Sequence, residues 1–514
     1  MTNPAALEPA RLPPVDAARR IGDLFRRCAL NEGGLLRTLG VREMAEASAL
    51  DLQTRLARTA GTDAQHQFIR LFFFGVPVNA DVLSAAIAPM TVAEWIDWGL
   101  LRTDAPGEVC AGVQLYPDGD QVFATDMPQF ENGRMVVPDA CVMTPGATTK
   151  AVKMLVIRRP VETALDVGTG CGILAIFAAG YARRAFATDL TQRSVDFTRF
   201  NAALNGIENL EALRGSLLEP VKDRRFDAIV SNPPFVISPS NRYIYRDGGM
   251  HGDMFVQSLI RQAAEVLNPG GTLQMLFDWA HFRGQHPAQR VASWFQGLGC
   301  DALVMRVSGM SPLDYAKFWT RQLEDNAGPE AQRQAIEHWL DYYRTQGIEG
   351  MSHGHLSLRK LPAGATRQPS VMVQEQRPGV TGNISEQVRR LLWNLDTLAM
   401  DDQSMLSRAF VPAPELRIRQ DVTPPGAHPQ GASAATGAQA AAEFSVLLRG
   451  GLGTTMPSSP DVARLVMSMS ASKPLGRIVE EIAQASGRGA SAIAGPVVMA
   501  TRKLLEAGMI EAHA

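Results

Sequence analysis

Apolar and polar residues follow two rhythms along the chain, and the change of rhythm divides it. From residue 16 to about residue 100, apolar side chains recur at helical spacing, as in "VDAARRIGDLFRRCALNEGGLL". The stretch "MTVAEWIDWGLL" predicts a short helix with a capping box formed by Thr91 and Glu94, ending at Gly99. The stretch "EVCAGVQLYPDGDQVFATDM" alternates about Pro117-Asp118-Gly119, which predicts a β-hairpin.

The predicted order, helices followed by a hairpin, is the order of elements in a winged-helix module. A helical cap that carries a small hairpin would produce the same pattern, so both interpretations stay open. We predict that residues 1–135 form a helical, winged-helix-like N-terminal domain.

Between about residue 140 and residue 362, short apolar runs alternate with helical patterns. The runs typical of buried strands are "ETALDVG", "AFATDL", "FDAIVSN", "GTLQMLFDW", "DALVMRV" and "GHLSLRKL". This alternation predicts an α/β domain over residues 136–362, with a Rossmann-like, doubly wound sheet of parallel strands. Two further helical patterns predict a helical insertion at about 312–347, before the last strand.

The composition changes beyond Leu361. Residues 363–442 include "RIRQDVTPPGAHPQGASAATGAQAAAEF", which predicts a connecting segment with a low-complexity linker. Residues 443–514 return to helical patterns and end on Gly508-Met509-Ile510, as the earlier helix ends on Gly99-Leu100-Leu101. This ending favours a second helical, winged-helix-like domain, and a simple helical docking domain fits the pattern equally well.

Composition and charge narrow the classes of function. The chain has 514 residues, more than one compact core usually contains, and 46% hydrophobic residues is ordinary for a globular protein. The formal net charge of −2 provides no global basic field for nucleic acid, but it allows a locally basic groove. Five scattered cysteines without CxxC spacing argue against a disulfide framework or a zinc site and indicate a cytoplasmic protein.

We expect neither a membrane segment nor a metal site. The N-terminus lacks the charged-then-apolar plan of a signal peptide, and no apolar run approaches the ~20 residues that span a bilayer. His251, His281, His353 and His355 form no metal-binding pattern. The last two lie at the edge of a strand pattern, where we expect a structural role.

Glycines follow an acidic residue at the first strand-to-helix turn, Asp166-Val167-Gly168-Thr169-Gly170-Cys171-Gly172. Glycines at alternate positions allow a tight turn and let a ligand approach the backbone, and the next helix supplies free amide hydrogens. A nicotinamide-binding loop would have the different spacing GxGxxG. Asp189 ends the second strand pattern, where a carboxylate can accept hydrogen bonds from both hydroxyls of a ribose.

The segment Asn232-Pro233-Pro234-Phe235 follows the strand pattern "FDAIVSN". Prolines lack amide hydrogens and have a fixed φ, so they cannot continue a ladder inside a sheet and instead hold a stiff, extended turn. We therefore expect this segment, the glycine turn and Asp189 at one carboxyl edge of the sheet, where open α/β proteins bind their ligands.

These three features, in this order, resemble the class I S-adenosylmethionine-dependent methyltransferases over roughly residues 140–362. They are most similar to the methyltransferase small domain type, whose (Asn/Asp)-Pro-Pro-(Tyr/Phe) motif serves the methylation of planar nitrogens. The resemblance implies S-adenosyl-L-methionine as the cofactor. The residues that it assigns to the cofactor are Asp166, Gly168, Thr169, Gly170, Gly172, Asp189, Leu190, Ser216, Leu217 and Asn232.

The resemblance also implies roles for parts of this set. The glycines would pass under the methionine part of the cofactor, Asp166 would help to fix the loop, and Asp189 would hold the ribose. Near the adenine the family often has Asp in a Gly-Asp pair, where this chain has Gly215-Ser216, so Ser216 would offer a hydroxyl. The segment Thr144–Thr149 either closes over the cofactor or begins a helix.

By the same resemblance, Asn232, Pro233, Pro234 and Phe235 carry the catalysis. An amide or an exocyclic amine is a poor nucleophile, because its lone pair is delocalised. The Asn232 side-chain oxygen and the Pro233 carbonyl can accept both N–H hydrogens, which points the lone pair at the methyl donor. Phe235 offers a ring for stacking a planar target, and the prolines hold the groups in place. No general base need lie close, since the product ammonium is acidic.

Phe235, Tyr243 and Arg246 are the candidates for substrate binding. Phe235 ends the motif, and the other two follow it. The "RDGG" stretch is similar to the glutamine methyltransferases of peptide release factors, which usually have Tyr in place of Phe235. Phe is more typical of the ribosomal RNA guanine-N2 methyltransferases, which usually have His where this chain has Val236.

We therefore expect an N-methyltransferase that acts on a planar nitrogen of a macromolecule. The favoured substrate is an exocyclic amine of a nucleobase in RNA, or in DNA, so the expected partner is nucleic acid. The alternatives are a protein glutamine N5-methyltransferase of the release-factor type, whose partner would be a translation factor, an enzyme for a small-molecule amine, and a catalytically inactive binding protein.

Overall fold

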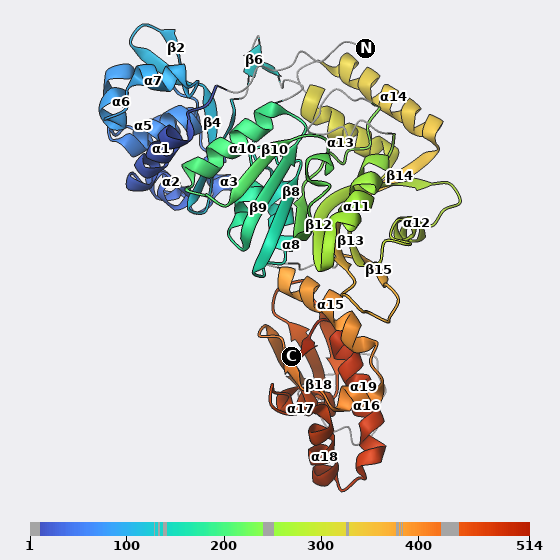
Figure 1. Cartoon of the computed structure of the whole chain (residues 1–514). Helices are drawn as coiled ribbons and strands as arrows, with labels where there is room; N and C mark the ends of the chain where they lie inside the picture. Colours follow the sequence, from blue (N-terminus) through green and yellow to red (C-terminus); the bar gives the residue numbers. More distant parts are fainter. Residues whose placement is uncertain are drawn as a thin grey trace, which may run out of the picture. The chain divides into compact units, whose positions relative to one another are not determined.

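The chain forms two compact units (Figure 1). The computed structural model describes residues 11–127, 129–131, 134–136, 141–239, 251–324, 328–376, 380, 382, 384–422 and 442–513. The first unit consists of Met1–Lys153, Arg159–Gly299 and Val307–Ala363, and the second of Met154–Arg158, Cys300–Arg306 and Gly364–Ala514.

Short helices and small sheets make up the N-terminal part of the first unit. The sheets have the strand orders β1-β3-β2, β4-β5 and β6-β7. The elements are α1 (Val15–Arg27), α2 (Glu32–Leu39), α3 (Met44–Ala49), α4 (Leu52–Arg58), α5 (Ala64–Phe68), the π-helix η1 (Ile69–Phe73), β1 (Val78–Asn79), α6 (Ala80–Ile87), α7 (Val92–Asp97), β2 (Leu101–Ala105), β3 (Glu108–Ala111), β4 (Val113–Asp118), β5 (Gln121–Asp126), β6 (Gln129–Glu131) and β7 (Arg134–Val136).

Two local predictions for this part are confirmed. The backbone N–H of Glu94 donates to the Thr91 hydroxyl over 3.2 Å, and the backbone N–H of Thr91 donates to the Glu94 carboxylate over 2.7 Å, which is a capping box at the start of α7. The hairpin β4–β5 turns at Gly119, whose φ is +59°. The winged-helix interpretation of residues 1–135 stays a prediction.

One large sheet forms the centre of the first unit. Its strand order is β10-β9-β8-β11-β12-β14, followed by the end of β13. The strands are β8 (Val161–Val167), β9 (Ala182–Asp189), β10 (Leu210–Arg214), β11 (Phe226–Ser231), β12 (Leu267–Phe282), β13 (Cys300–Met310) and β14 (Ile348–Lys360). The helices around them are α8 (Ala147–Leu155), α9 (Ile173–Ala179), α10 (Gln192–Leu204), the 3₁₀-helix η2 (Glu219–Val221), α11 (Met254–Val266), α12 (Pro287–Ser293), α13 (Pro312–Glu324) and α14 (Pro329–Gln346).

The predicted α/β, doubly wound class is confirmed, but the prediction of a wholly parallel sheet is wrong at β14. The strands from β10 to β12 pair in parallel, whereas β14 runs antiparallel to the Thr272–Phe282 part of β12. The reason is the pair of helices α13 and α14 between β13 and β14. A helical hairpin returns the chain to the edge that it left, so the next strand must run in the opposite direction.

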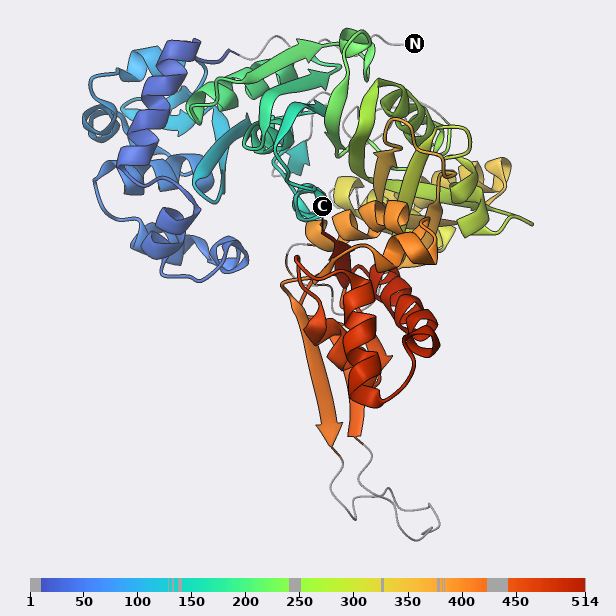
Figure 2. The same ribbon diagram turned by 60° about the horizontal axis from the view of Figure 1, so that its bottom comes forward.

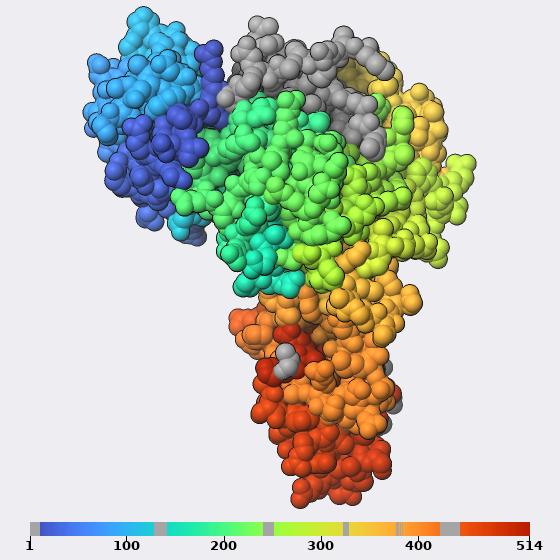
Figure 3. All heavy atoms as spheres, in the orientation of Figure 1, coloured from blue at the N-terminus to red at the C-terminus, as the bar shows by residue number. Residues whose placement is uncertain are grey.

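The N-terminal part is joined to the large sheet through α10, which packs against α1 and β5. The buried Asn201 of α10 donates to the carbonyl oxygens of Ala124 on β5 and of Cys171 in the glycine turn, over 2.9 and 2.8 Å. Its side-chain oxygen accepts the N–H of Ala124 over 2.8 Å. In Figure 3 the dark blue atoms of the first helices adjoin the green atoms of this region. One buried amide therefore links the hairpin to the glycine turn.

The second unit contains the first part of β13, which pairs in parallel with β15, and the rest of the chain. The antiparallel strands β17 and β18 can be followed in Figure 2. The remaining elements are β15 (Val371–Glu375), α15 (Ser385–Leu398), α16 (Asp402–Leu406), β16 (Phe410–Pro412), β17 (Leu416–Val422), β18 (Ala442–Leu448), β19 (Thr455–Ser458), α17 (Pro460–Ser468), α18 (Leu475–Ser486), α19 (Ala490–Glu506) and β20 (Ile510–Ala512).

The segment 363–442, for which we predict a connection with a linker, thus contains α15, α16 and β17. The two ends of the low-complexity stretch are paired strands, and its middle lies outside the described residues. The polar face of α15 holds the final turn of the chain, because Arg390 donates to the Gly508 carbonyl and Asn394 donates to the carbonyls of Leu505 and Ile510.

Candidate active site

The glycine turn between β8 and α9 adopts left-handed backbone conformations at three positions. The φ angles of Gly168, Gly170 and Gly172 are +73°, +57° and +87°. A Cβ atom added at Gly168 or Gly170 would meet nothing within 4 Å, whereas at Gly172 it would lie 2.9–3.0 Å from Thr198 on α10. Two glycines therefore present bare backbone to open space, and the third allows the turn to pack against α10.

Asp166 lies beneath this turn, with its side chain fully buried. One carboxyl oxygen accepts the Thr169 hydroxyl over 2.7 Å, and the other has no partner among the described residues. Burial raises the pKa of Asp166 to about 7. The carboxyl group thus braces the turn from inside rather than facing the open space.

Asp189 ends β9 and lies beside the turn. Its carboxylate accepts the N–H of Gly170 over 3.0 Å and the N–H of Thr191 over 3.0 Å, and burial raises its pKa. Leu190 follows with half of its side chain exposed. Ser216 and Leu217 come after β10, and Leu217 has a φ of +50°. The strands β8, β9 and β10 are parallel, so the residues at their carboxyl ends meet at one edge of the sheet. Asp189-Leu190 and Ser216-Leu217 therefore lie near the glycine turn.

The Asn232-Pro233-Pro234-Phe235 segment follows β11 at the same edge. The side-chain NH₂ group of Asn232 donates to the hydroxyl oxygens of Thr148 and Thr149, over 3.1 and 3.2 Å. Both threonines lie in the first turn of α8. The amide oxygen Oδ1 is buried and has no hydrogen-bond donor among the described residues. The amide is therefore fixed by its nitrogen and keeps an unused acceptor.

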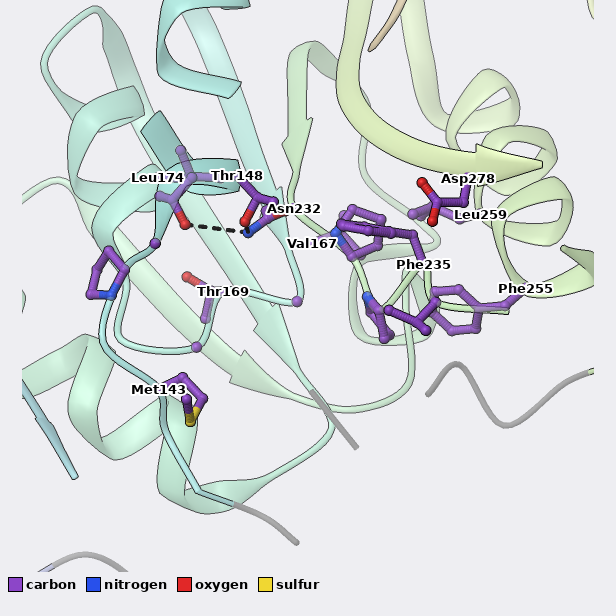
Figure 4. A pocket seen from close by; sticks show the side chains of 18 of the residues that line it. Met143, Thr148, Val167, Thr169, Leu174, Asn232, Phe235, Phe255, Leu259 and Asp278 are labelled. Atoms are coloured by element: carbon purple, nitrogen blue, oxygen red, sulfur yellow. Dashed lines mark hydrogen bonds between the residues drawn. The ribbon is translucent and has the colours of Figure 1, made fainter. Parts of the chain in front are cut away.

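These segments line one cavity of about 770 Å³. All of the assigned residues that the structure describes are in its wall except Asp166, beneath the turn, and Gly172, packed on Thr198. Figure 4 shows Asn232 in the middle, with Thr169 and Met143 on one side and Phe235, Phe255 and Asp278 on the other. Thr144–Thr149 also line the cavity. Tyr243 and Arg246 lie outside the described residues.

Aromatic rings surround the end of the cavity beyond Asn232. Phe235 is buried, and its ring contacts Trp319 edge to face at 6.2 Å between centroids and His353 at 5.5 Å. Phe318, about half exposed, meets Trp319 edge to face. The helical insertion supplies Phe318 and Trp319, so it forms part of this wall.

A second polar group in the cavity wall has no signal in the sequence motifs. Asp278 on β12 lies directly opposite His353 on β14, and His353 Nδ1 is 2.7 Å from the carboxylate. The Tyr315 hydroxyl donates to the other carboxylate oxygen over 2.5 Å. We expect only a structural role for His353 from its place at a strand edge, but its side chain lines the cavity. The register of two strands brings these residues together, and sequence spacing cannot reveal it.

The described residues also bear on metal binding and membrane crossing. No group of three or more His, Cys, Asp or Glu residues in this part of the chain could hold a metal ion. Within the same residues, every helix is too short or too polar to cross a bilayer.

Comparison with known proteins places these features in a family. The sequence profile of the methyltransferase small domain matches residues 142–288. The chain is similar to the ribosomal protein uL3 glutamine methyltransferase of Bradyrhizobium diazoefficiens (29% identity, over 30% of this chain and 54% of that protein). It is also similar to the release factor glutamine methyltransferase of Geobacter sulfurreducens, with 34% identity over 26% of this chain and 52% of that protein.

A third relative is the ribosomal RNA small subunit methyltransferase C of Salmonella choleraesuis, with 36% identity over 22% of this chain and 30% of that protein. The chain spans about half the length of the first two relatives and less than a third of the last. Residues 142–288, which match the methyltransferase small domain, include the glycine turn, Asp189, Asn232 and Asp278. The chain therefore contains a class I S-adenosylmethionine-dependent methyltransferase domain of the methyltransferase small domain family.

Proposed function

We propose that the protein is an S-adenosylmethionine-dependent N-methyltransferase that acts on a planar NH₂ group of a macromolecule. The observation that carries this proposal is the Asn232 amide. Its oxygen is buried beside the cavity without a donor, while its nitrogen is held by Thr148 and Thr149. A buried acceptor without a partner is costly, so such a group is expected where a ligand supplies the missing donor.

The glycine-turn side of the cavity fits the cofactor. Gly168 and Gly170 present backbone to open space, as a methionine chain passing over the turn requires. The Asp189 carboxylate, already held by two backbone N–H groups, can also accept the ribose hydroxyls, and Ser216 and Leu217 would face the adenine. The bound cofactor supplies a methyl group on a positively charged sulfur.

Asn232 and Pro233 then act on the target nitrogen. The Asn232 oxygen accepts one N–H hydrogen and the Pro233 carbonyl accepts the other, so the NH₂ group turns its lone pair towards the methyl donor. Orientation of this kind lowers the barrier without a change in the intrinsic reactivity of either partner. The two prolines keep both acceptors in place before the target binds.

The aromatic end of the cavity favours a nucleobase as the target. Phe235, Phe318 and Trp319 offer flat apolar surface around a space that a ring can enter, and extruded bases are recognised by stacking of this kind. The relative named as a ribosomal RNA small subunit methyltransferase supports an RNA substrate.

A protein glutamine amide is the second candidate. It is favoured by the two relatives that act on glutamine, which align over more of this chain than the RNA enzyme does. The Asn232 acceptor suits a carboxamide as well as an exocyclic amine, because both are planar NH₂ groups with delocalised lone pairs.

The test uses the full-length protein, tritiated S-adenosylmethionine and lysate from a strain that lacks the gene. We expect labelled macromolecule with the wild-type protein and none with Asn232→Ala, while Asn232→Asp keeps an acceptor oxygen and retains part of the activity. Both variants should still bind S-adenosylhomocysteine in calorimetry. Label removed by nuclease supports a nucleobase target, and label removed only by protease supports glutamine.

Unchanged transfer by Asn232→Ala would refute the assigned role of the amide. Tight binding of S-adenosylhomocysteine without transfer to any fraction would instead favour a catalytically inactive binding protein.

A further inference from the structure

Three polar side chains from three elements converge at the aromatic end of the cavity. The Asp278 side chain is 2% exposed, and its carboxylate contacts His353 Nδ1 at 2.7 Å and the Tyr315 hydroxyl at 2.5 Å. Burial and the nearby carboxylate raise the pKa of Tyr315 well above its ordinary value, so its hydroxyl keeps its proton and donates it to Asp278. Asp278 is thus an acceptor with two donors.

This arrangement determines which nitrogen of His353 remains available. A carboxylate only accepts hydrogen bonds, so Nδ1 carries the proton that faces Asp278, and in the neutral ring Nε2 is then the acceptor. About a quarter of the His353 side chain is exposed, and this side chain lines the cavity. Nε2 is the atom left to meet a ligand.

The same group is tied to the Asn-Pro-Pro-Phe segment. The N–H of Ile237 donates to the Tyr315 hydroxyl over 3.1 Å, and the Ile237 carbonyl accepts the Tyr343 hydroxyl over 2.8 Å. The ring of Phe235 lies 5.5 Å from the ring of His353. The helical insertion therefore holds the end of the segment and the Asp278–His353 pair in one rigid arrangement.

We propose that His353 Nε2 is the proton acceptor of the methyl transfer, and that Asp278 and Tyr315 are positioning residues. This inference rests on the proposed function of the site, and it replaces the expectation that no general base need lie close. As the bond between the target nitrogen and the methyl carbon forms, the bond between that carbon and sulfur breaks, and sulfur keeps its electron pair. The nitrogen becomes positively charged. One of the two hydrogens held by the Asn232 oxygen and the Pro233 carbonyl then leaves as a proton to Nε2, and Asp278 balances the charge of the resulting imidazolium.

The titratable groups packed around His353 are few among the described residues. They are Asp278 on β12, Tyr315 on α13 and His355 on β14 itself. Burial and the nearby His353 lower the pKa of His355 to about 4, so His355 stays neutral above that pH.

The first experiment needs no cofactor or substrate. Long-range ¹H–¹⁵N spectra of the histidine-labelled protein report the tautomer of each ring, and the His353 signal is identified by its loss in His353→Gln. We expect the neutral form of the His353 ring to carry its proton on Nδ1. In Asp278→Asn this preference should be lost. A proton on Nε2 of the neutral ring in the wild-type protein would overturn the inference.

The second experiment measures transfer of tritiated methyl groups to total ribosomal RNA and to total ribosomal protein between pH 5.5 and 9. We expect His353→Gln to lower kcat by about 10²-fold across this range, because a general base commonly contributes at least this factor. S-adenosylhomocysteine affinity should stay within about twofold. The exposed His286 provides a matched control, and His286→Gln should leave both kcat and the pH profile unchanged.

The outcomes separate the two proposals. Transfer that is abolished by Asn232→Ala but keeps its wild-type kcat in His353→Gln overturns the role of His353 and leaves the proposed function intact. Transfer that survives Asn232→Ala, or no transfer to either fraction, overturns the proposed function and this inference with it. Tyr315→Phe should reduce kcat less than His353→Gln does and should leave the His353 tautomer unchanged, as expected for a positioning residue.

Discussion

Substitution of single glycines can separate the part of the turn that faces the cofactor from the part that holds the fold. Gly170→Ala and Gly172→Ala place the same methyl group two residues apart. At Gly170 the added carbon meets nothing within 4 Å, and at Gly172 it lies 2.9–3.0 Å from both the backbone and the side chain of Thr198. Gly206→Ala is the matched control, because Gly206 has a φ of +70°, open space around it and no place in the cavity wall.

The expected magnitudes follow from these contacts. Left-handed backbone costs a residue with a Cβ atom roughly 1–2 kcal/mol, which applies to all three positions. The clash with Thr198 adds about 1–3 kcal/mol at Gly172, because α10 is packed on both sides and cannot move away freely. We therefore expect Gly172→Ala to lose about 2–5 kcal/mol of unfolding free energy, and Gly170→Ala and Gly206→Ala about 1–2 kcal/mol each.

Two assays together test this reasoning. Urea titration followed by circular dichroism gives the free energy of unfolding, and calorimetry gives the affinity for S-adenosylhomocysteine. We expect Gly170→Ala to weaken binding by at least about 10-fold, because its methyl group occupies space that the ligand needs, and Gly206→Ala to bind normally. This separation of roles would be refuted by wild-type affinity in Gly170→Ala. It would also be refuted by a smaller loss of unfolding free energy in Gly172→Ala than in Gly170→Ala.

Three further predictions concern other side chains of the site. Joint replacement of Thr148 and Thr149 by Val removes two hydrogen bonds of about 1 kcal/mol each from the amide of Asn232, so kcat should fall roughly 30-fold in the tritium assay, and an unchanged kcat would show that the threonines do not orient it. The folded protein retains a proton on Asp166 up to about pH 7, whereas the unfolded chain releases it near pH 4. The free energy of unfolding should therefore fall by up to about 4 kcal/mol as the pH rises through this window, and urea titrations should show no such fall in Asp166→Asn. Burial raises the pKa of Cys171 to about 12, so iodoacetamide at pH 8 should leave it unmodified in the folded protein, as mass spectrometry of the digest can verify.

Much of the site could be predicted because each of its parts is a short stretch at the end of a strand or directly after one. The glycine turn and Asp189 follow β8 and β9, and parallel strands bring the segments that follow them to the same edge of the sheet. The Asn232 segment is recognisable for the same reason, since two prolines cannot continue a strand inside a sheet. The resemblance that implies the class and the cofactor rests on these residues, because each motif is a short stretch of neighbouring positions.

The direction of β14 and the partners of Asn232 depended on contacts between distant segments. A helical pattern at 312–347 indicates two helices, but not that they return the chain to the same edge and reverse the next strand. Asn232 follows an obvious motif, yet its orientation is set by threonines more than eighty residues earlier. Such pairings are chosen by the packing of whole elements.

The Asp278–His353 pair shows this division most clearly. Each residue alone resembles an ordinary strand residue, and 75 positions separate them. The sequence by itself determined the local devices, namely the turn, the carboxylate at a strand end and the rigid proline segment, because these depend on neighbouring residues. Only the tertiary structure decided which polar groups share the aromatic end of the cavity, because the register between β12 and β14 is a property of the whole folded sheet.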